Sequence, residues 1–445
     1  MLKKNDKVTI EIISLTGEGY GVAKHDEIVV FVPYAAVGDV LAVNIEKVYP
    51  RYAYAKIIDI KKPSPDRITP DCPHFGQCGG CDFRHITYAA ELHAKEKSCQ
   101  DAFTRIGKLS PEFLPIIPSP VTDGYRNKAA FPFGTDKDGN TVFGFYRKNT
   151  HSIIPCADCP LHPEQFSEIA HFIANSLKQF HILPYDRTTG KGTLRHLFIR
   201  RGHNTSDICV TLVMSAPHPA QHVFANRLRK AYPDIHGVVV NINPHDTNVI
   251  LGANEETLSG KPYMEDVICG LTARIDSGSF YQVNVPLAER LFRVVKSFAE
   301  PTGKRILDLY CGTGLIGLTM AREAKEILGL DVTFQSVVAA NVTAQQNGIT
   351  NARFIERDAN NLTGLGFTPD LIVLDPTRKG LEGDTAEKVA AFGVPRIVMM
   401  SCNPATAARD CAKFAELGYD TKKVQPGDMF PHTKHVECVV LLERR

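Results

Sequence analysis

The chain has 445 residues, of which 43% are hydrophobic and 22% are charged, and its formal net charge is +2. This length predicts about three domains, and the composition excludes a generally disordered chain. No segment approaches the roughly 18 consecutive apolar residues of a membrane span, and the polar start at Lys3 and Lys4 lacks the apolar core of a signal peptide. We therefore expect a cytoplasmic protein that has no membrane partner.

The chain contains twelve cysteines, which are too sparse for a disulfide scaffold in a protein of this size. In a reducing compartment, clustered cysteines are typical of metal sites, and an isolated cysteine can act as a nucleophile. The sequence contains both arrangements.

Residues 1–62 have the pattern of a small β-domain. Turns separate β-branched segments at 7–13, 27–33, 39–45 and 53–60. Short strands at this spacing predict a five-stranded β-barrel of the oligonucleotide-binding kind, although other small barrels share the pattern. Residues 1–60 contain 7 basic and 8 acidic side chains. Their net charge of −1 is unlike that of a domain that grips phosphate.

Residues 63–275 are predicted to form a central α/β domain. A segment rich in Pro, Asp and Cys at 61–87 precedes a predicted helix over 88–107, which can pack on the C-terminal domain. Residues 185–235 carry 8 basic and 3 acidic side chains. This surplus is a better candidate than the barrel for a surface that faces phosphate, and an ordinary solvated surface is the alternative.

Residues 276–445 alternate predicted strands and helices. The expected strands are 305–309, 326–330, 352–355, 370–374, 396–400 and 436–442. This order predicts a Rossmann-like, doubly wound parallel sheet, with ligands at the carboxyl ends of its strands.

A glycine-rich turn follows the first of these strands, at Cys311-Gly-Thr-Gly-Leu-Ile-Gly317. Gly312 and Gly314 allow the backbone to approach a ligand, and the following helix offers unpaired N–H groups. Asp331 lies 19 residues after Gly312, where a carboxylate can bind the ribose hydroxyls of a nucleoside cofactor. A nicotinamide-binding domain satisfies the same glycine pattern.

Two further features favour S-adenosylmethionine over a nicotinamide cofactor. Asp308 precedes the glycines in an Asp-x-x-Cys-Gly-x-Gly arrangement typical of class I methyltransferases. The fourth strand ends in a polar cluster, Asp375-Pro-Thr-Arg-Lys379, where a methyl acceptor would lie.

Cys402 follows the fifth strand and should emerge at the edge of the sheet that binds the cofactor. A thiolate that adds to carbon 6 of uracil makes carbon 5 nucleophilic enough to take a methyl group, and a base must then remove the carbon-5 proton. Glu437, on the last predicted strand, is the candidate base. Without these neighbouring motifs, Cys402 would be interpreted as a buried apolar residue and Glu437 as an exposed strand residue.

Cys72, Cys78 and Cys81 are separated by small residues and fit thiolate ligation of an iron–sulfur cluster or of zinc. The fourth ligand must come from elsewhere in the chain. The residues alone leave both Cys156 and Cys159 open for this position.

The ordered motifs resemble those of the RNA 5-methyluridine methyltransferase family with an N-terminal TRAM domain, and most of all its 23S ribosomal RNA branch. The resemblance covers essentially the whole chain. It is carried by Cys-x5-Cys-Gly-Gly-Cys, Tyr125-Arg126-Asn127-Lys128, Ser279-Phe-Tyr-Gln-Val-Asn284, Asp-x-x-Cys-Gly-Thr-Gly, Asp-Pro-x-Arg, Ser-Cys-Asn-Pro and His-Val-Glu437.

The resemblance implies a role for each matched residue. Cys402 matches the nucleophile and Glu437 the general base. The positions that match S-adenosylmethionine-binding residues are Gln282, Tyr310, Asp331 and Asp375, together with Gly312 and Gly314. Phe280 and Gln282 match positions that hold the flipped target base. Arg126 and Lys128 are expected to contribute to RNA affinity.

For the metal site, the resemblance implies a structural 4Fe–4S cluster on Cys72, Cys78, Cys81 and Cys159, with zinc as the alternative metal. Cys159 is chosen over Cys156 because Pro160 and Leu161 follow it. Two positions depart from the family pattern: Asp331 stands where many members have Glu, and Tyr310 replaces a frequent Phe.

We therefore expect a monomeric, S-adenosylmethionine-dependent RNA (uracil-C5)-methyltransferase that acts on 23S ribosomal RNA or on an assembly intermediate. One alternative is a tRNA (uracil-C5)-methyltransferase, because the catalytic motifs are shared. The alternative from a different class is a non-catalytic RNA-binding or ribosome assembly factor that retains the cofactor fold.

Overall fold

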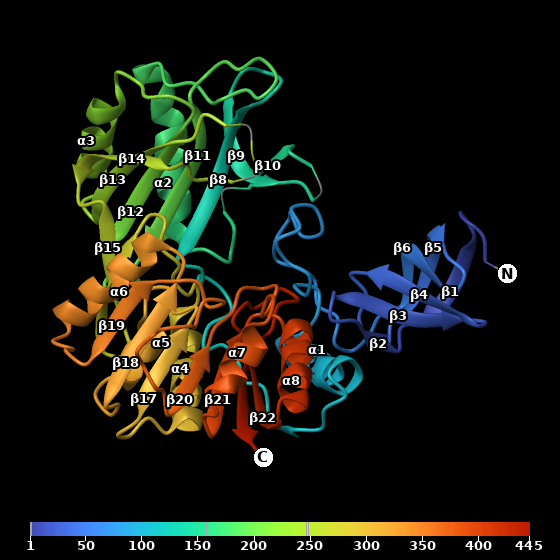
Figure 1. Cartoon of the computed structure of the whole chain (residues 1–445). Helices are drawn as coiled ribbons and strands as arrows, with labels where there is room; N and C mark the ends of the chain where they lie inside the picture. The colour runs from blue at the N-terminus through green and yellow to red at the C-terminus, as the bar shows by residue number, and fades with distance from the viewer. Residues whose placement is uncertain (1, 149, 157, 246, 248) are drawn as a thin grey trace.

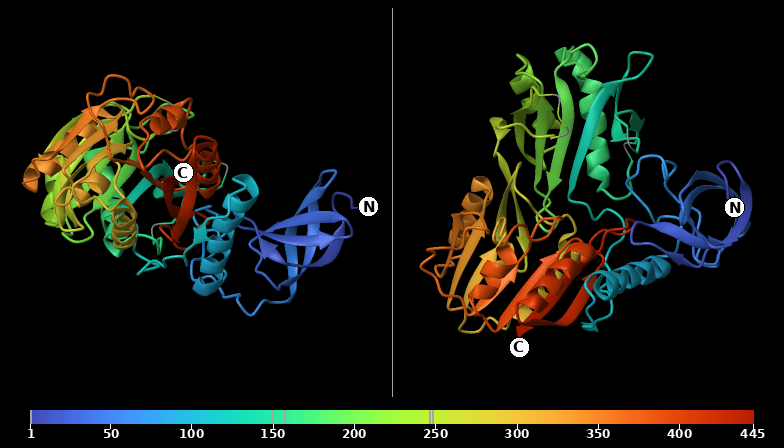
Figure 2. Two further views of the ribbon diagram at one scale, coloured as in Figure 1. Left: turned by 60° about the horizontal axis from the view of Figure 1, so that its bottom comes forward. Right: turned by 45° about the vertical axis from the view of Figure 1, so that its right-hand side comes forward.

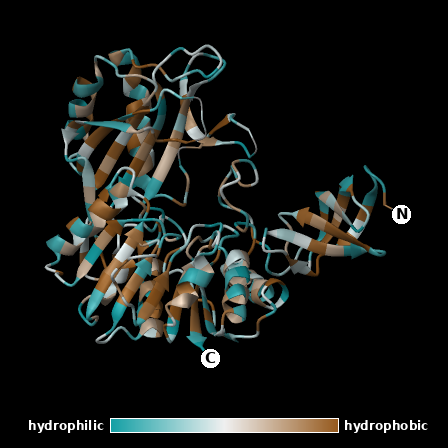
Figure 3. Ribbon diagram, viewed as in Figure 1, coloured by the Kyte–Doolittle hydropathy of each residue, from teal (hydrophilic) through white to brown (hydrophobic). Residues whose placement is uncertain are grey.

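The structure is a computed structural model that describes residues 2–148, 150–156, 158–245, 247 and 249–445. The described chain forms an N-terminal β-domain, a central α/β unit and a C-terminal α/β unit (Figure 1). Among these residues, no helix combines the length and the apolar character required to cross a membrane. Hydrophobic residues concentrate on the strands and on the helix faces that cover them (Figure 3).

The N-terminal domain is a curved sheet with the strand order β1-β5-β6-β4-β3-β2. Its strands are β1 (Lys7–Glu11), β2 (Ser14–Leu15), β3 (Tyr20–His25), β4 (Ile28–Pro33), β5 (Val40–Val48) and β6 (Tyr52–Lys62). Only Ile12 and Ile13 separate β1 from β2, so the two edge strands are halves of one bent segment. Alternate residues such as Val30, Val32 and Ala53 form the core on one face.

The predicted five-stranded barrel is therefore not what the described residues show. They form a half-barrel of six strands, because residues 14–25, between the first two predicted segments, supply β2 and β3, and β3 pairs with β4. Ile13 N donates a hydrogen bond to Val22 O (2.8 Å), which ties the bend to β3.

The central unit contains a seven-stranded sheet with the order β10-β9-β8-β11-β12-β13-β14. Its strands are β8 (Lys128–Thr135), β9 (Thr141–Tyr146), β10 (Ile153–Pro155), β11 (Leu194–Arg201), β12 (Ile208–Met214), β13 (Ile235–Ile242) and β14 (Asn254–Gly260). Helices α2 (Glu164–Ser176) and α3 (Gln221–Ala231) pack their apolar faces into the same core. A hairpin of β15 (Tyr263–Ile268) and β16 (Leu271–Asp276) leads to the C-terminal unit.

The C-terminal sheet has the order β19-β18-β17-β20-β21-β23-β22-β7. Its strands are β17 (Arg305–Leu309), β18 (Glu326–Asp331), β19 (Ala352–Glu356), β20 (Leu371–Leu374), β21 (Arg396–Ser401), β22 (Tyr419–Gly427), β23 (Glu437–Arg444) and the short β7 (Glu112–Phe113). Strands β17 to β21 are parallel, which confirms the predicted α/β class of this unit. The sequence did not predict β22, nor that β23 runs antiparallel to β21.

Helices cover both faces of this sheet. Helices α4 (Val285–Ala299) and α5 (Leu315–Met320) pack on one face, whereas α7 (Thr385–Ala391) and α8 (Pro404–Glu416) pack on the other. Helix α6 (Phe334–Gln346) packs beside β19.

Helix α1 (Tyr88–Asp101) and the π-helical turn Ala102–Ile106 lie against α8, and Phe103 enters the core of the C-terminal unit (Figure 2). Residues 88–113 thus pack with the C-terminal sheet, although the residues of the central unit separate them from most of that sheet in the sequence.

Candidate active site

Three carboxylates meet at the carboxyl edge of the parallel strands. Asp308 lies in β17, Asp331 ends β18, and Asp375 follows β20. Burial, with the charges of Asp375 and Asp331, raises the pKa of Asp308 to about 8. Burial and the charge of Asp331 raise the pKa of Asp375 to about 7. Carboxyl groups this close together resist ionisation, and a ligand that carries positive charge would favour their ionised forms.

The glycine-rich turn lies beside these carboxylates. Gly312 N donates to Asp331 Oδ2 (2.9 Å), and Thr333 N donates to Asp331 Oδ1 (2.8 Å). Gly312 and Gly314 both have positive φ angles, 51° and 73°. A β-carbon at Gly314 would lie 2.6 Å from the Phe354 ring, whereas one at Gly312 would meet no atom within 4 Å. The turn therefore packs against the protein at Gly314 and leaves open space at Gly312.

These residues fit S-adenosylmethionine, which carries a sulfonium and an ammonium cation next to a ribose. The buried Oδ1 of Asp308 has no hydrogen-bond partner in the described part of the chain, as expected beside a ligand pocket. Asp331 presents its carboxylate at the end of β18, where the ribose hydroxyls of a nucleoside would lie.

Cys402 and Glu437 lie on neighbouring strands at the same edge of the sheet. Ser401 of β21 pairs with Cys438 of β23 in antiparallel register, which places Cys402, directly after β21, opposite Glu437. Glu437 is buried, and this burial, together with the charge of Asp375, raises its pKa well above the ordinary value. Burial and then the charges of Glu437 and Asp375 raise the pKa of the Cys402 thiol to about 11.

Arg378 provides the opposing positive charge, since it lowers the pKa of Cys402. Its Nη2 lies 3.3 Å from His435 Nδ1, and its carbonyl oxygen accepts a hydrogen bond from Asn403 Nδ2 (3.3 Å). Burial and Arg378 lower the pKa of His435 to about 4, so this imidazole is neutral near pH 7. Arg378 is thus the cation held next to the thiol.

The segment 279–284 lies at the junction of the central and C-terminal units. The carbonyl oxygen of Gln282 accepts a hydrogen bond from Asn127 Nδ2 (2.8 Å), and Asn127 N donates to Val283 O (3.1 Å). The Gln282 side chain is almost buried, whereas Phe280 is 57% exposed. Tyr310 follows β17 with a positive φ of 60° and packs its ring against the core.

Arg126 and Lys128 do not project freely from the surface. Arg126 Nε donates to Tyr125 Oη (3.3 Å), and its guanidinium lies 5.8 Å from the centre of that ring. Lys128 Nζ lies 5.9 Å from the centre of the Phe198 ring. Burial and the nearby Arg200 and Arg126 lower the pKa of Lys128 to about 8.

The basic surplus over 185–235 is only partly a surface feature. Arg195 is buried and donates to Asn243 O (2.8 Å), and buried Arg200 donates to Ser279 O (2.5 Å). These two cations serve the packing of the central unit.

The cysteines expected to hold a metal approach one another from two segments. The charge of Cys159 raises the pKa of Cys81, and Cys78 and Cys72 raise the pKa of Cys159, in each case after the larger effect of burial. Cys156 is affected in the same way by Cys159, Cys72 and Cys78. Across the described ranges, however, no group of three or more His, Cys, Asp or Glu side chains has the spacing needed to hold a metal ion.

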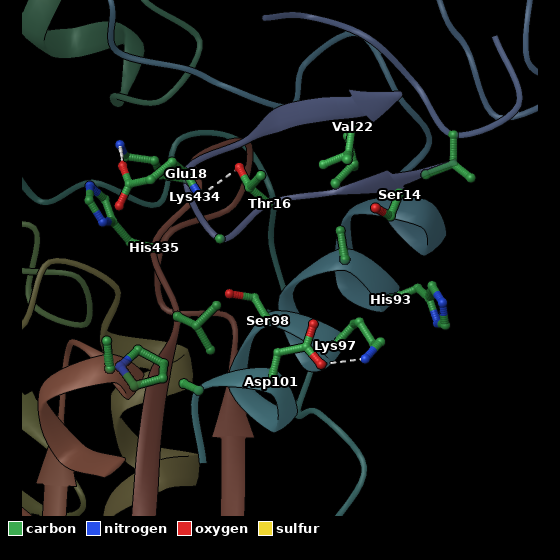
Figure 4. A pocket seen from close by; sticks show the side chains of 18 of the residues that line it. Ser14, Thr16, Glu18, Val22, His93, Lys97, Ser98, Asp101, Lys434 and His435 are labelled. Atoms are coloured by element: carbon green, nitrogen blue, oxygen red, sulfur yellow. Dashed lines mark hydrogen bonds and ion pairs between the residues drawn. The ribbon is translucent and has the colours of Figure 1, made fainter. Parts of the chain in front are cut away.

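A cavity of about 1010 Å³ leads from the N-terminal domain to Cys402. Ser14, Thr16 and Val22 line one wall, and α1 forms the other with His93 and Lys97 (Figure 4). The wall near Cys402 is formed by Arg378, Lys434 and His435. We call this cavity the interdomain groove. The sequence did not predict it, because its walls come from separate domains.

A buried charge network was also missed. Lys95 Nζ donates to Glu91 Oε1 (2.6 Å), Asp428 Oδ1 (2.5 Å) and Phe430 O (3.0 Å), and all three charged side chains are buried. His432 N donates to Glu91 Oε1 (2.7 Å), so α1 fixes the segment that precedes Glu437. The sequence signal for this network is that Lys95 lies on the same predicted helix face as the apolar residues Cys99 and Phe103, where a lysine must be buried with a partner.

Comparisons with known proteins agree with this geometry. The family model described as tRNA (Uracil-5-)-methyltransferase matches residues 269–445, and that of the TRAM domain matches residues 3–58. An uncharacterized RNA methyltransferase of Halalkalibacterium halodurans is 37% identical over 99% of this chain and 98% of its own length. One of Clostridium acetobutylicum is 37% identical over 100% of this chain and 98% of its own.

The chain belongs to the TRAM-domain RNA uracil-5-methyltransferase family. Its fold agrees with the crystal structure of Pyrococcus abyssi tRNA (uracil-54, C5)-methyltransferase in complex with S-adenosyl-L-homocysteine, with a TM-score of 0.79 and 26% identity over 98% of this chain and 100% of that one. The curved sheet that residues 3–58 form is thus a TRAM domain, and the C-terminal unit is a methyltransferase domain. The family assignment supports S-adenosylmethionine as the methyl donor.

Proposed function

We propose that this methyltransferase converts a uridine of 23S ribosomal RNA to 5-methyluridine through a covalent bond between Cys402 and carbon 6 of the base. The observation that carries this proposal is the placement of Cys402 opposite Glu437, at the sheet edge that also presents Asp308, Asp331 and Asp375. S-Adenosylmethionine, when bound at Gly312, Gly314, Asp331, Asp375, Gln282 and Tyr310, supplies an electrophilic methyl group.

Cys402 Sγ, as the thiolate, adds to carbon 6 of the uracil, and the electrons of the C5–C6 double bond become available at carbon 5. Carbon 5 then forms its bond to the methyl group, and the bond between that methyl carbon and the sulfonium sulfur breaks, so that S-adenosylhomocysteine is left. Glu437 accepts the proton that carbon 5 still carries, the double bond re-forms, and the bond between carbon 6 and Sγ breaks. Arg378 favours the thiolate that this sequence requires.

The uridine must leave its stack to reach Cys402, since carbon 6 is covered inside a helix. Phe280 is 57% exposed, and Gln282 lies two residues further along the same segment. We assign both to holding the extruded base. Arg126 and Lys128 are assigned to the RNA strand at the junction between the domains.

We also propose that Cys72, Cys78, Cys81 and Cys159 hold a structural 4Fe–4S cluster. The support is the close spacing of the first three cysteines in the sequence, and the charge interactions of Cys159 with Cys81, Cys78 and Cys72 across the two segments. A cluster would cross-link the loop before α1 to the segment before α2. Its test is the visible absorbance of anaerobically purified protein. A colourless protein with stoichiometric zinc would contradict it. On this assignment, the three functional units are residues 1–62, 63–275 and 276–445, with α1 packed on the last.

Transfer RNA is the second candidate substrate, because the Pyrococcus abyssi structure of a tRNA (uracil-54, C5)-methyltransferase is similar over 98% of this chain. Mapping of 5-methyluridine in ribosomal and transfer RNA from cells with and without this protein separates the two. We expect the loss of a modified position in 23S ribosomal RNA. A loss confined to tRNA would contradict our choice of substrate.

The covalent mechanism is tested with Glu437→Gln. This variant should form a covalent protein–RNA adduct that is stable in denaturing gels, because the thiolate cannot leave until the carbon-5 proton is removed. In the matched Cys402→Ala variant we expect neither adduct nor methyl transfer, with S-adenosylhomocysteine binding retained. Turnover by Cys402→Ala would exclude the covalent mechanism, and absence of the adduct in Glu437→Gln would remove Glu437 from its role.

A further inference from the structure

Five aromatic rings gather on the outer face of the TRAM sheet. Tyr49 and Tyr52 stack with their ring centres 4.7 Å apart and their planes at 22°. Tyr54 contacts Tyr52 at 5.9 Å and Phe31 at 5.6 Å. Tyr20 extends the group from β3, with its ring 5.9 Å from that of Tyr54. We call these five residues the aromatic face.

The aromatic face is not part of the hydrophobic core of its domain. In β6, Ala53 and Ala55 point into that core, and the alternation of a strand therefore turns Tyr52 and Tyr54 outward. Tyr49 is 41% exposed and Tyr52 is 37% exposed. Large rings that are stacked yet open to solvent are typical of surfaces that bind a partner.

The register of the strands joins this face to the interdomain groove. Phe31 of β4 pairs with Tyr54 of β6 and with Val22 of β3. Both Phe31 and Val22 also line the groove that leads to Cys402. The aromatic face and the groove therefore form one continuous surface that ends at the proposed nucleophile.

The charges around the aromatic face fit a nucleic acid strand. Lys24 and Lys56 are exposed on strands that carry the rings, and exposed Lys47 lies in β5, two residues before Tyr49. Within the described chain no carboxylate lies within salt-bridge distance of these three lysines. Two carboxylates of this domain are engaged elsewhere: buried Asp39 pairs with Arg67, and Glu18 pairs with Lys434. The three lysines thus leave positive charge beside the rings, although the domain as a whole has a net charge of −1.

We propose that the aromatic face stacks unpaired bases of the RNA that flank the target uridine, and that the strand continues through the interdomain groove to Cys402. This inference rests on the proposed RNA substrate and adds the site that holds the strand outside the catalytic domain. Stacking on aromatic rings suits a domain with little net charge, because every base has a π-face and the interaction needs few phosphate contacts.

The test measures binding of a fluorescein-labelled oligouridylate of about 20 nucleotides, longer than the ~4–16 nucleotides that one such domain occupies. Full-length protein is used in a Cys402→Ala background, so that no covalent bond contributes. Tyr49→Ala/Tyr52→Ala should weaken binding by about 5- to 160-fold per lost stacking interaction. Tyr49→Phe/Tyr52→Phe keeps the rings and should bind as the parent does, and Ile58→Ala controls for the loss of an exposed apolar side chain elsewhere on β6.

Salt titration distinguishes stacking from phosphate contact. The logarithm of affinity should fall with the logarithm of salt concentration at the same slope in the parent and in the Tyr→Ala variant, since no charge is removed. Lys56→Gln, which removes an exposed lysine beside the rings, should reduce the slope by about 0.7. Unchanged affinity of the Tyr→Ala variant, or a reduced slope, would overturn the proposal.

Two other outcomes remain distinct. If Tyr→Ala leaves RNA affinity unchanged but abolishes the binding of a co-purifying protein, the face docks a protein, and the proposal is wrong. If Glu437→Gln with an intact aromatic face forms no adduct while Tyr→Ala still weakens RNA binding, the covalent mechanism fails and the aromatic face stands.

Discussion

The two regions on either side of Cys402 differ in charge. The carboxyl edge of β17, β18 and β20 brings together three carboxylates, and burial together with neighbouring negative charge raises the pKa of two of them, Asp308 and Asp375. The interdomain groove on the other side is lined by four cations, Arg378, Lys434, Lys97 and Arg105, and by three carboxylates, Glu18, Asp66 and Asp101. Glu18 pairs with Lys434, and Asp101 pairs with Lys97 and Arg105. A cationic methyl donor thus meets carboxylates on one side of the thiol, whereas an RNA strand meets a groove of mixed charge in which Arg378 lies beside Cys402.

The largest expected effect is on stability, and it comes from the buried charge network that connects the two regions. Lys95 is the cation of a buried network that ties α1, a wall of the groove, to the segment before Glu437. Lys95→Met leaves Glu91 and Asp428 buried without their cation, and we expect the free energy of unfolding to fall by about 3–5 kcal/mol. Denaturant unfolding measures this loss.

Lys97→Met is the matched control for Lys95→Met. Lys97 pairs with Asp101 on the exposed side of the same helix, so its loss should cost only about 0.2–1 kcal/mol. Equal losses in the two variants would show that the buried network does not hold the groove to the catalytic site.

The role of the carboxylates in cofactor binding is tested by Asp331→Asn. Asp331 accepts hydrogen bonds from Gly312 N and Thr333 N, and its carboxylate is the group assigned to the ribose. We expect S-adenosylhomocysteine to bind more weakly by about 1.5–3 kcal/mol, which calorimetry measures, because a charge-assisted hydrogen bond is lost. RNA affinity should not change, and a parallel loss of RNA binding would contradict the separation of the two regions.

The ionisation of Cys402 is tested through the pH dependence of adduct formation. Burial, Glu437 and Asp375 raise the pKa of Cys402 to about 11, so the thiol is mostly protonated at pH 7 to 9. The rate should therefore rise with pH throughout this range. The raised pKa of Glu437 acts in the same direction on turnover, because its base form also increases with pH.

Arg378→Gln sharpens this test. Removal of the cation that lowers the pKa of Cys402 should move the rate profile to higher pH, whereas Arg378→Lys should keep most of the original profile. The two profiles are measured at saturating RNA, so that weaker binding does not enter. An unchanged profile in Arg378→Gln would show that the thiolate is stabilised by another group.

Local patterns in the sequence determined much of the catalytic domain. The alternation of apolar strands with helices predicted the parallel sheet, and the glycine-rich turn with Asp331 predicted a nucleoside pocket at its carboxyl edge. These features depend on residues close in sequence, and strand order in such folds is restricted. The resemblance to a known family supplied the roles assigned to Cys402 and Glu437.

Tertiary structure decided the remaining features, because they depend on segments far apart in the chain. Glu437 begins its strand, and it reaches the edge that holds Cys402 only because β23 runs antiparallel to β21. Lys95 donates a hydrogen bond to Asp428, which lies 333 residues later in the sequence. The aromatic face and the groove arise from the pairing of β3, β4 and β6 and from the docking of α1, none of which the spacing of residues in one segment can specify.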